Sequence, residues 1–186
     1  MARKPEILRG VSGFVIEGTE IMKLPSFIYR SERMGKGGKA FSLYKIRTLK
    51  PTKGQFAREE EYTRFGKFLR KTKLDEFLQI FNILKGEMRL VGPRPDFKES
   101  YEFIPAYIRE ILLSVKPGLT SLASIHFYDE ERLLKEIEKD EYRGYWMSVK
   151  PAKILLDVFY VKNRCFLLDV AVLYLTAKEF IKSFFK

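Results

Sequence analysis

Two neighbouring carboxylates, Asp75 and Glu76, are the residues of this sequence best suited to chemistry. They stand in the first turn of a predicted helix, where unpaired backbone N–H groups and the helix dipole favour negative charge. We therefore expect both side chains to stay ionised. An ionised carboxylate can attack an electrophile or bind Mg²⁺.

Acidic residues at the start of a helix also have an ordinary structural explanation. Thr72 and Asp75 have the spacing of a capping box, in which side chains satisfy the first backbone N–H groups of a helix. Taken alone, the carboxylate pair therefore favours a structural role over a catalytic one.

Basic residues around the pair shift this balance toward chemistry. Arg94 lies between Pro93 and Pro95, so its backbone loses little freedom when the guanidinium binds an oxyanion. Each basic residue taken singly is most simply a solvated charge. Together with two carboxylates, however, they form the set of groups that phosphoryl transfer uses. The basic residues are Arg64, Lys67, Arg70, Lys71, Lys73, Lys85, Arg89 and Arg94.

The residue patterns of the segments that must position these groups predict a mostly helical α+β domain with a small β-hairpin. Two short alternating segments around the glycine-rich turn 35–39 predict the hairpin near residues 27–49, with Lys45 and Arg47 on one face. We expect a single domain over residues 1–186, in which residues 1–26 form a weakly patterned segment. Helices are predicted over 56–71, 72–85, 101–114, 130–139, 153–161 and 166–185, and an extended segment over 119–126.

The predicted helix after Thr72 has an apolar face and a defined end. Its hydrophobic residues recur at helical spacing, and Gly86 is suited to cap its carboxyl end. The apolar residues are Leu74, Phe77, Leu78, Phe81 and Leu84.

Composition narrows the classes of function. The chain has 186 residues and a formal net charge of +11, with eleven basic and four acidic residues among the first 50, which indicates an anionic partner. One cysteine, Cys165, excludes an intramolecular disulfide, and one histidine, His126, argues against a histidine relay. No uninterrupted apolar run reaches the roughly 18 residues that span a membrane. Since no nucleic-acid-binding module is recognisable, we expect no nucleic-acid partner.

The sequence from residue 65 to residue 95 resembles the signature of the bacterial sugar transferase family. These are the monotopic phosphoglycosyl transferases that begin glycoconjugate assembly, such as that of capsule, exopolysaccharide, O-antigen or glycoprotein. The resemblance extends over most of the chain from about Phe27 to the C-terminus. Its motifs are Tyr44–Thr48, Phe65–Gln79, Phe81–Pro95, Val115–Thr120 and Leu156–Leu175, the last including Asn163 and Asp169.

The resemblance implies a reaction and roles for the residues. A UDP-sugar binds with Mg²⁺, the carboxylate matching Asp75 attacks the sugar-linked phosphate, and UMP leaves. The covalent phosphosugar then passes to a polyprenyl phosphate at the cytoplasmic face of the bacterial inner membrane. Glu76 matches the family's metal-binding or assisting carboxylate, so Asp75 and Glu76 are the expected catalytic and metal-binding pair. The expected phosphate-binding residues are Lys45, Arg70 and Arg94, with Arg47 and Lys116 as weaker candidates.

The sequence departs from the family pattern in two places. Members normally begin with a long hydrophobic membrane segment, whereas residues 1–26 contain seven charged residues and no such segment. Many members also have a Gly-Trp or similar pair after the position of Thr120, where this chain has Ser121–His126, so the sugar or nucleotide preference could differ. The first departure supports an alternative hypothesis, a non-catalytic relative that binds a membrane or a partner.

The C-terminal helix bears on membrane binding. For residues 166–175 the pattern favours packing in the core, and for residues 180–185 core and headgroup boundary are equally compatible with it. The apolar residues near the end stand beside Lys178, Lys182 and Lys186, which could meet anionic lipid. We therefore predict interfacial amphipathic helices and peripheral association with an anionic membrane surface.

Overall fold

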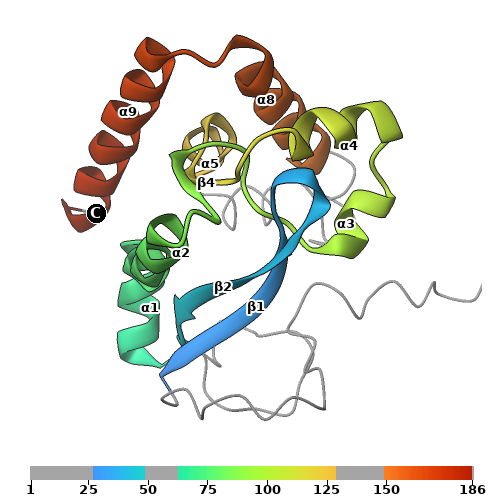
Figure 1. Cartoon of the computed structure of the whole chain (residues 1–186). Helices are drawn as coiled ribbons and strands as arrows, with labels where there is room; N and C mark the ends of the chain where they lie inside the picture. The colour runs from blue at the N-terminus through green and yellow to red at the C-terminus, as the bar shows by residue number, and fades with distance from the viewer. Residues whose placement is uncertain (1–26, 49–62, 129–148, 186) are drawn as a thin grey trace, which may run out of the picture.

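The computed structural model describes residues 27–48, 63–128 and 149–185, and these form an α+β fold in which helices dominate (Figure 1). The fold class predicted from sequence is therefore confirmed. Three predicted parts lie outside the described residues: the helix over 130–139, the first residues 56–62 of the helix over 56–71, and the segment 1–26. The larger helices are α1 (Arg64–Lys71), α4 (Ala106–Leu113), α8 (Lys150–Asn163) and α9 (Phe166–Phe185).

The predicted hairpin is present. Strands β1 (Ile28–Met34) and β2 (Ala40–Ile46) pair antiparallel, with Ile28 opposite Ile46 and Met34 opposite Ala40. The short 3₁₀ turn η2 (Lys36–Gly38) joins them, and its Gly37 has φ 69°, a conformation that favours glycine. Phe41 and Leu43 of β2 are buried with Met88, so one face of the hairpin closes a small core.

A second, parallel pair of strands was not predicted. Strand β3 (Arg89–Val91) pairs with β4 (Gly118–Thr120), and Val91 lies opposite Thr120. Gly92 approaches this second strand so closely that a Cβ there would lie 2.9 Å from the backbone nitrogen of Gly118. Gly118 in turn donates its N–H to the carbonyl of Pro93 at 2.9 Å. The lack of side chains on both glycines therefore seats the Pro93–Pro95 turn against the strand pair.

The segment after α1 inverts the expected pattern of burial. It forms the 3₁₀ helix η4 (Leu74–Gln79) and the short helix α2 (Ile80–Leu84). Phe77 and Leu84 are 65% and 77% exposed, while the polar Gln79 and Asn82 are buried. Asn82 accepts a hydrogen bond from the Tyr44 N–H at 3.3 Å and donates to the Ser42 carbonyl at 2.6 Å, so it holds this segment against β2.

The capping expectations for this segment were half right. Thr72 ends α1 instead of opening the next helix, because its hydroxyl donates to the Phe68 carbonyl at 2.8 Å. The capping box with Asp75 is therefore wrong. Lys73, in the left-handed conformation at φ 56°, reverses the chain into η4. Gly86, at φ 75°, donates its N–H to the Ile83 carbonyl and ends α2 as predicted.

Two further predictions about secondary structure were inaccurate. The helix expected over 101–114 is divided into α3 (Lys98–Glu102) and α4, with Pro105 at the N-cap of the second. The segment expected to be extended over 119–126 is extended only in β4. After it, Ser121 caps the helix α5 (Leu122–His126) by accepting the Ser124 N–H at 3.0 Å.

Helices α8 and α9 pack across the second strand pair and were predicted correctly as helices. The fully buried Tyr160 donates its hydroxyl to Asp169 at 2.6 Å and lies 3.1 Å from the Val91 carbonyl oxygen. Arg89 completes the junction with an ion pair to Asp169 at 2.7 Å. These contacts fix the first turn of α9 to β3 and so to the turn that holds Arg94.

Candidate active site

Glu76 is the centre of a cluster of opposite charges. Lys45 of β2 donates its Nζ to Glu76 Oε1 at 2.9 Å. The Arg94 guanidinium meets both carboxylate oxygens, with one nitrogen 3.2 Å from Oε2 and the other on Oε1. Three segments far apart in sequence therefore meet at one carboxylate: the end of the hairpin, η4 and the Pro93–Pro95 turn.

The cluster fixes the charge state of Glu76. Burial alone would raise the pKa of this carboxyl, but the charges of Arg94 and Lys45 and their hydrogen bonds hold it well below its usual range. Burial also lowers the pKa of the Lys45 ammonium, and the Glu76 charge opposes that effect. Glu76 is thus an ionised carboxylate whose two oxygens are both engaged by cations.

Asp75 differs from its neighbour. Its Oδ1 is buried and has no hydrogen-bond partner among the described residues. Burial raises the pKa of this carboxyl, the Glu76 charge raises it further, and Lys45, Arg70 and Lys73 oppose the rise. The two neighbouring carboxyls therefore differ in the direction of their pKa shifts, because Asp75 is buried beside an anion and Glu76 is held by cations. That Asp75 is ionised stays a prediction.

The structure brings together four of the predicted residues and places a fifth nearby. Lys45, Asp75, Glu76 and Arg94 form the cluster, and Arg70 acts electrostatically on Asp75 from the end of α1. These positions are compatible with the predicted roles, which stay predictions.

The two weaker candidates lie apart from the cluster. Arg47 is exposed just beyond β2, and the ion pairs seen among residues 27–48, 63–128 and 149–185 do not join it to either carboxylate. Lys116 is exposed before β4 and has its Nζ 3.5 Å from the position of a Cβ on Gly86. A phosphate-binding role for either residue remains a prediction.

An apolar cavity of about 340 Å³ opens beside the cluster. Glu76 and Arg94 line it together with residues of η4, β4, α5 and α9. The apolar lining includes Phe77, Leu90, Leu119, Ile125, Leu173 and Phe180. The arrangement suits a ligand with a charged head and a hydrocarbon tail, because charge and apolar surface adjoin.

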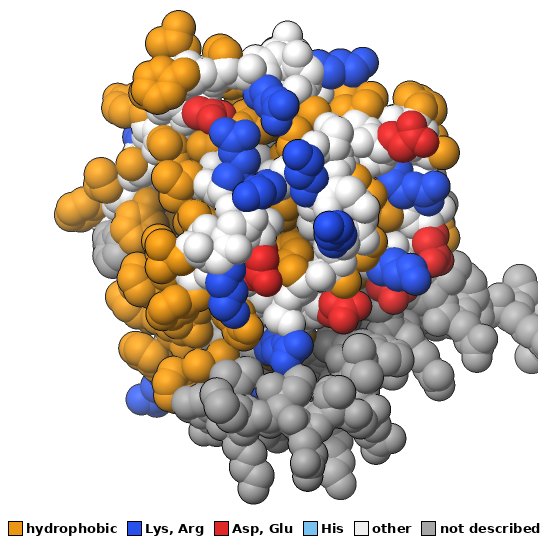
Figure 2. All heavy atoms as spheres, in the orientation of Figure 1, with side chains coloured by type: hydrophobic (Ala, Val, Ile, Leu, Met, Phe, Trp, Pro, Cys, Tyr) orange, Lys and Arg blue, Asp and Glu red, His pale blue; other side chains and the backbone are white. Residues whose placement is uncertain are grey.

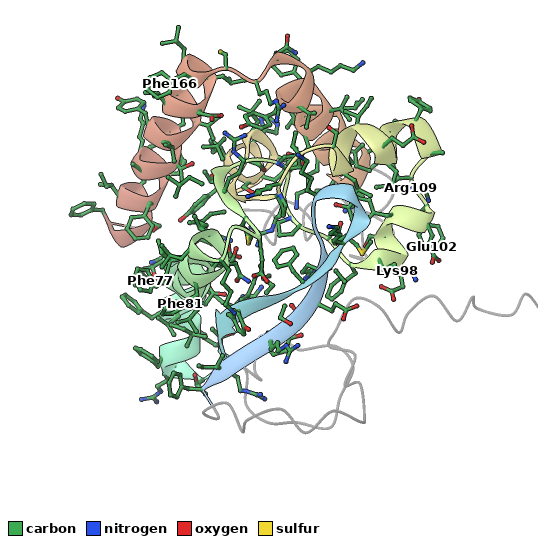
Figure 3. All side chains as sticks on the ribbon, in the orientation of Figure 1. Phe77, Phe81, Lys98, Glu102, Arg109 and Phe166 are labelled. Atoms are coloured by element: carbon green, nitrogen blue, oxygen red, sulfur yellow. The ribbon has the colours of Figure 1, made fainter. Side chains whose placement is uncertain are left out.

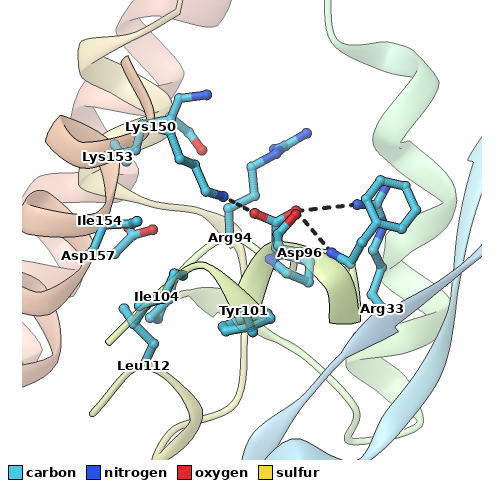
Figure 4. A pocket seen from close by; sticks show the side chains of 16 residues that line it. Arg33, Arg94, Asp96, Tyr101, Ile104, Leu112, Lys150, Lys153, Ile154 and Asp157 are labelled. Carbon is cyan, nitrogen blue, oxygen red and sulfur yellow. Dashed lines mark hydrogen bonds and ion pairs between the residues drawn. The ribbon is translucent and has the colours of Figure 1, made fainter. Parts of the chain in front are cut away.

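A second cavity, of about 250 Å³, adjoins the Pro93–Pro95 turn (Figure 4). We call it the polar cavity, because several charged side chains line it. Lys150 of α8 forms an ion pair with Asp96, and the Arg33 guanidinium stacks 3.3 Å from the centre of the Phe97 ring. Asp157 lines the cavity from the same helix. Arg94, Ser124 and Lys153 line both cavities, so the two spaces adjoin.

Two charged residues of this polar cavity, Lys150 and Asp157, were missed in the sequence. Lys150 and Asp157 belong to a helix whose charged positions look like an ordinary solvated face. Both are in fact buried. Their separation of seven residues, two turns on one face, is the signal that would have paired them.

The side chains of the carboxylate pair decide how a metal ion would be held at this site. Among the residues that the structure describes, no group of three or more His, Cys, Asp or Glu side chains is placed to hold a metal ion. Mg²⁺ commonly binds through one or two carboxylates together with substrate phosphates and water. The unpartnered, buried oxygen of Asp75 fits such a hard cation, whereas Glu76 would have to exchange a contact with Lys45 or Arg94.

A band of exposed hydrophobic side chains runs beside the cluster. Figure 2 shows hydrophobic side chains gathered along one edge of the molecule, over α9, α2 and α1, with Lys and Arg beside them. Phe77, Phe81 and Phe166 point outward on this edge, away from Lys98 and Glu102 on the opposite side (Figure 3). We call this band the apolar edge. It comprises Phe65, Phe68, Phe77, Phe81, Leu84, Phe166, Leu167, Val170, Tyr174, Ile181 and Phe185.

The apolar edge corrects the interpretation of residues 166–175 as mainly a core segment. Phe166 and Leu167 are 79% and 78% exposed, while Val172 on the other face of α9 is fully buried. Within the described segments, none of the helices has the length and hydropathy needed to cross a bilayer.

Comparison with known proteins identifies a family. Residues 13–183 match the protein-family model described as bacterial sugar transferase. The match extends over the hairpin, the carboxylate cluster, the Pro93–Pro95 turn and both C-terminal helices.

Three similar proteins illustrate the match. An uncharacterised sugar transferase, EpsL of Bacillus subtilis, is 34% identical over 161 residues, covering 83% of this chain and 70% of that protein. A UDP-N-acetylgalactosamine-undecaprenyl-phosphate N-acetylgalactosaminephosphotransferase of Aeromonas hydrophila is 32% identical over 84% of this chain. A UDP-glucose:undecaprenyl-phosphate glucose-1-phosphate transferase of Klebsiella pneumoniae is 34% identical over 84% of this chain. The chain spans 36% and 33% of these last two proteins.

Proposed function

Because this chain belongs to the bacterial sugar transferase family, we propose that it transfers a sugar-1-phosphate from a UDP-sugar to a polyprenyl phosphate and so initiates glycoconjugate synthesis. Two of its relatives are named as undecaprenyl-phosphate transferases that use UDP-linked sugars. The observation that supports the proposal most directly is the contrast within the carboxylate pair. Both oxygens of Glu76 are held by cations, whereas Asp75 has an oxygen without a partner among the described residues.

In the proposed first step Asp75 is the nucleophile. An ionised oxygen of its carboxylate attacks the phosphorus that bears the sugar, and an acyl–phosphate bond forms. The bond from that phosphorus to the bridging oxygen breaks, and UMP leaves with its electron pair. Because burial raises the pKa of Asp75, its ionised form is a more basic nucleophile than an ordinary carboxylate.

In the second step an oxygen of the polyprenyl phosphate attacks the same phosphorus. The acyl–phosphate bond breaks, and the Asp75 carboxylate is regenerated as the lipid-linked sugar diphosphate leaves. Glu76 takes no covalent part. It fixes Lys45 and Arg94, so that these cations are already in place when the charged phosphates arrive.

We propose Lys45, Arg70 and Arg94 as the main phosphate-binding residues, with Arg47 and Lys116 in lesser roles. Arg94 has donors on a planar guanidinium in a turn fixed by two prolines, which suits a diphosphate. Mg²⁺ would be held by Asp75 and Glu76 with the donor phosphates, and when bound it would neutralise charge on the phosphate oxygens.

The apolar cavity suits the acceptor, since Glu76 and Arg94 line it and most of its remaining lining is apolar. The acceptor resides in a membrane, and the apolar edge offers a surface that would dip into the headgroup region. We therefore propose that the protein acts at the cytoplasmic face of the bacterial inner membrane with this edge against the lipid.

The proposal is tested by UMP release. The protein is incubated in detergent with a panel of UDP-sugars, Mg²⁺ and polyprenyl phosphate, and UMP is measured. We expect release with at least one donor, no release with Asp75→Asn, and no release on addition of a chelator. If folded protein releases no UMP from any donor, the alternative of a non-catalytic binding relative replaces this proposal.

A further inference from the structure

We propose that the polar cavity between the Pro93–Pro95 turn and α8 binds a hydroxyl-bearing ring of the UDP-sugar, with Asp157 accepting a hydrogen bond from one of its hydroxyls. This inference rests on the proposed function, because it places one part of the donor. The hydroxyls could belong to the transferred sugar or to the ribose, and the experiment below separates these sources.

The first support is the state of Asp157. Only 8% of this residue is exposed, and its Oδ1 has no hydrogen-bond partner among the described residues. The carboxylate accepts hydrogen bonds from the Arg94 N–H and the Ser121 hydroxyl, and the residue lines the cavity with acceptor capacity unused. A buried carboxylate oxygen without a partner is costly, and a ligand hydroxyl would remove that cost.

The second support is position. Arg94, Ser124 and Lys153 line both this cavity and the one that contains Glu76. A donor whose diphosphate lies at the Arg94 guanidinium therefore has its neighbouring group within reach of the polar cavity. Lys153 stands one turn of α8 before Asp157, so an ammonium and a carboxylate line the same wall.

The third support is size and chemistry. A volume of about 250 Å³ corresponds to roughly eight waters at liquid density, which suits one sugar ring. The walls combine polar groups, including Ser100 and Ser124, with the apolar Ile104 and Ile154. Polar edges and apolar ring faces together are what a sugar ring requires.

The ion pair beside the ring site limits the charge that the ligand can bring. Lys150 is paired with Asp96, and Arg33 lies 3.9 Å from the same carboxylate (Figure 4). The two cations that flank the space share Asp96, and Asp157 adds a second negative charge to the same lining. A second phosphate is not required there, and a neutral polyol fits better than an anion.

The test measures binding by calorimetry with protein that does not consume the donor. Asp75→Asn serves as the reference and is compared with Asp75→Asn/Asp157→Asn. The ligands are pyrophosphate, UDP and a UDP-sugar that the wild-type protein turns over. Asn keeps an acceptor for the Arg94 N–H and the Ser121 hydroxyl but weakens the bond to a ligand hydroxyl.

A loss of about tenfold or more for the UDP-sugar, with UDP and pyrophosphate unchanged, places the transferred sugar in the cavity. An equal loss for UDP and the UDP-sugar, with pyrophosphate unchanged, places the ribose there. If pyrophosphate affinity falls as much as the others, Asp157 acts by positioning Arg94 and the inference is wrong. Affinities that all stay within twofold also overturn it.

A second variant keeps the inference testable if the double variant unfolds. Ser100→Leu, from the wall of the cavity in α3, would occupy part of the space and leave Asp157 itself unchanged. We expect it to weaken the same ligands as Asp157→Asn, and unchanged affinity would count against the inference. Failure of the proposed function is distinct, because wild-type protein would then release no UMP from any donor.

Discussion

Asp75 and Glu76 are consecutive carboxylates whose pKa values are displaced in opposite directions. Burial acts on both, but Arg94 and Lys45 bind directly to Glu76 and overcome it there. At Asp75 burial and the charge of Glu76 prevail. One residue is thereby fixed as an anion that organises cations, and the other is kept basic with an unused oxygen.

The Glu76 ion pairs are expected to stabilise the fold above the ordinary carboxyl range. Glu76→Gln leaves Lys45 buried without its charged partner. We expect the free energy of unfolding at pH 7 to fall by about 1–3 kcal/mol. This is less than for a fully buried pair, because Arg94 is partly exposed. Since the pKa of Glu76 is lower in the folded state, the wild-type advantage should shrink as pH falls below about 4.5. Urea unfolding at pH 7, 5 and 3.5 measures it, and an advantage that grows on acidification would contradict this account.

The guanidinium fork of Arg94 is expected to matter beyond its charge. Lys at this position keeps the charge but loses the geometry that meets both Glu76 oxygens. We expect Arg94→Lys to lower kcat/KM for the donor by on the order of 10²-fold. Arg109→Lys on α4, on the far side of the molecule, is the matched control and should change it less than threefold (Figure 3). Equal effects of the two substitutions would remove Arg94 from its proposed role.

Asp157 should show the stability cost of a binding residue. Burial raises the pKa of Asp157 to about 7. The hydrogen bonds from the Arg94 N–H and the Ser121 hydroxyl and the charge of Lys150 oppose the rise. Because the folded state holds the proton more tightly than the unfolded state, ionisation costs stability as pH rises from about 4 to about 7. Three pKa units correspond to at most about 4 kcal/mol.

Asp157→Asn is therefore expected to be more stable than wild type at pH 8 and to lose that advantage at pH 4. Thermal unfolding at the two pH values measures the difference. Asp169→Asn provides a contrast, because Asp169 is satisfied by Arg89 and Tyr160, and its loss should destabilise at pH 8. The prediction is refuted if the stability of Asp157→Asn relative to wild type is lower at pH 8 than at pH 4.

The apolar edge is expected to bind lipid. Phe77 on the edge and Tyr107 at the start of α4, on the other side of the molecule, are 65% and 66% exposed. Phe77→Ser should reduce co-sedimentation with vesicles that contain anionic lipid by about threefold or more, since it removes a side chain that would enter the interface. Tyr107→Ser should have little effect. Equal binding by both variants, or binding by neither the variants nor the wild type, would contradict a membrane role for the edge.

Much of the local structure followed from sequence because periodicity reports it well. The hairpin around Gly37, the helix end at Gly86 and the two C-terminal helices were predicted from spacing and turn chemistry. The capping box at Thr72 failed because its hydroxyl bonds backward into α1. The parallel pairing of β3 with β4 was missed, since two three-residue strands leave almost no pattern.

The site was predictable in its residues more than in its electrostatics. Lys45, Glu76 and Arg94 were named as candidates, but their direct contacts depend on three distant segments meeting. The exposed positions of Phe77 and Phe81 were hidden by a pattern equally suited to a core. The burial of Asp157 was likewise invisible, because a charged residue on a helix usually faces water.

The central claim, that Asp75 carries the sugar-1-phosphate, is tested most directly by the intact mass of the protein. Wild type and Asp75→Asn are incubated with Mg²⁺ and a UDP-sugar that supports UMP release, without acceptor, and then analysed by mass spectrometry. We expect wild type to gain the mass of one sugar-1-phosphate, located by peptide mapping at Asp75, and to lose it when polyprenyl phosphate is added. The Asp75→Asn protein should gain nothing. UMP release without any covalent adduct, or an adduct that persists in Asp75→Asn, would contradict the mechanism.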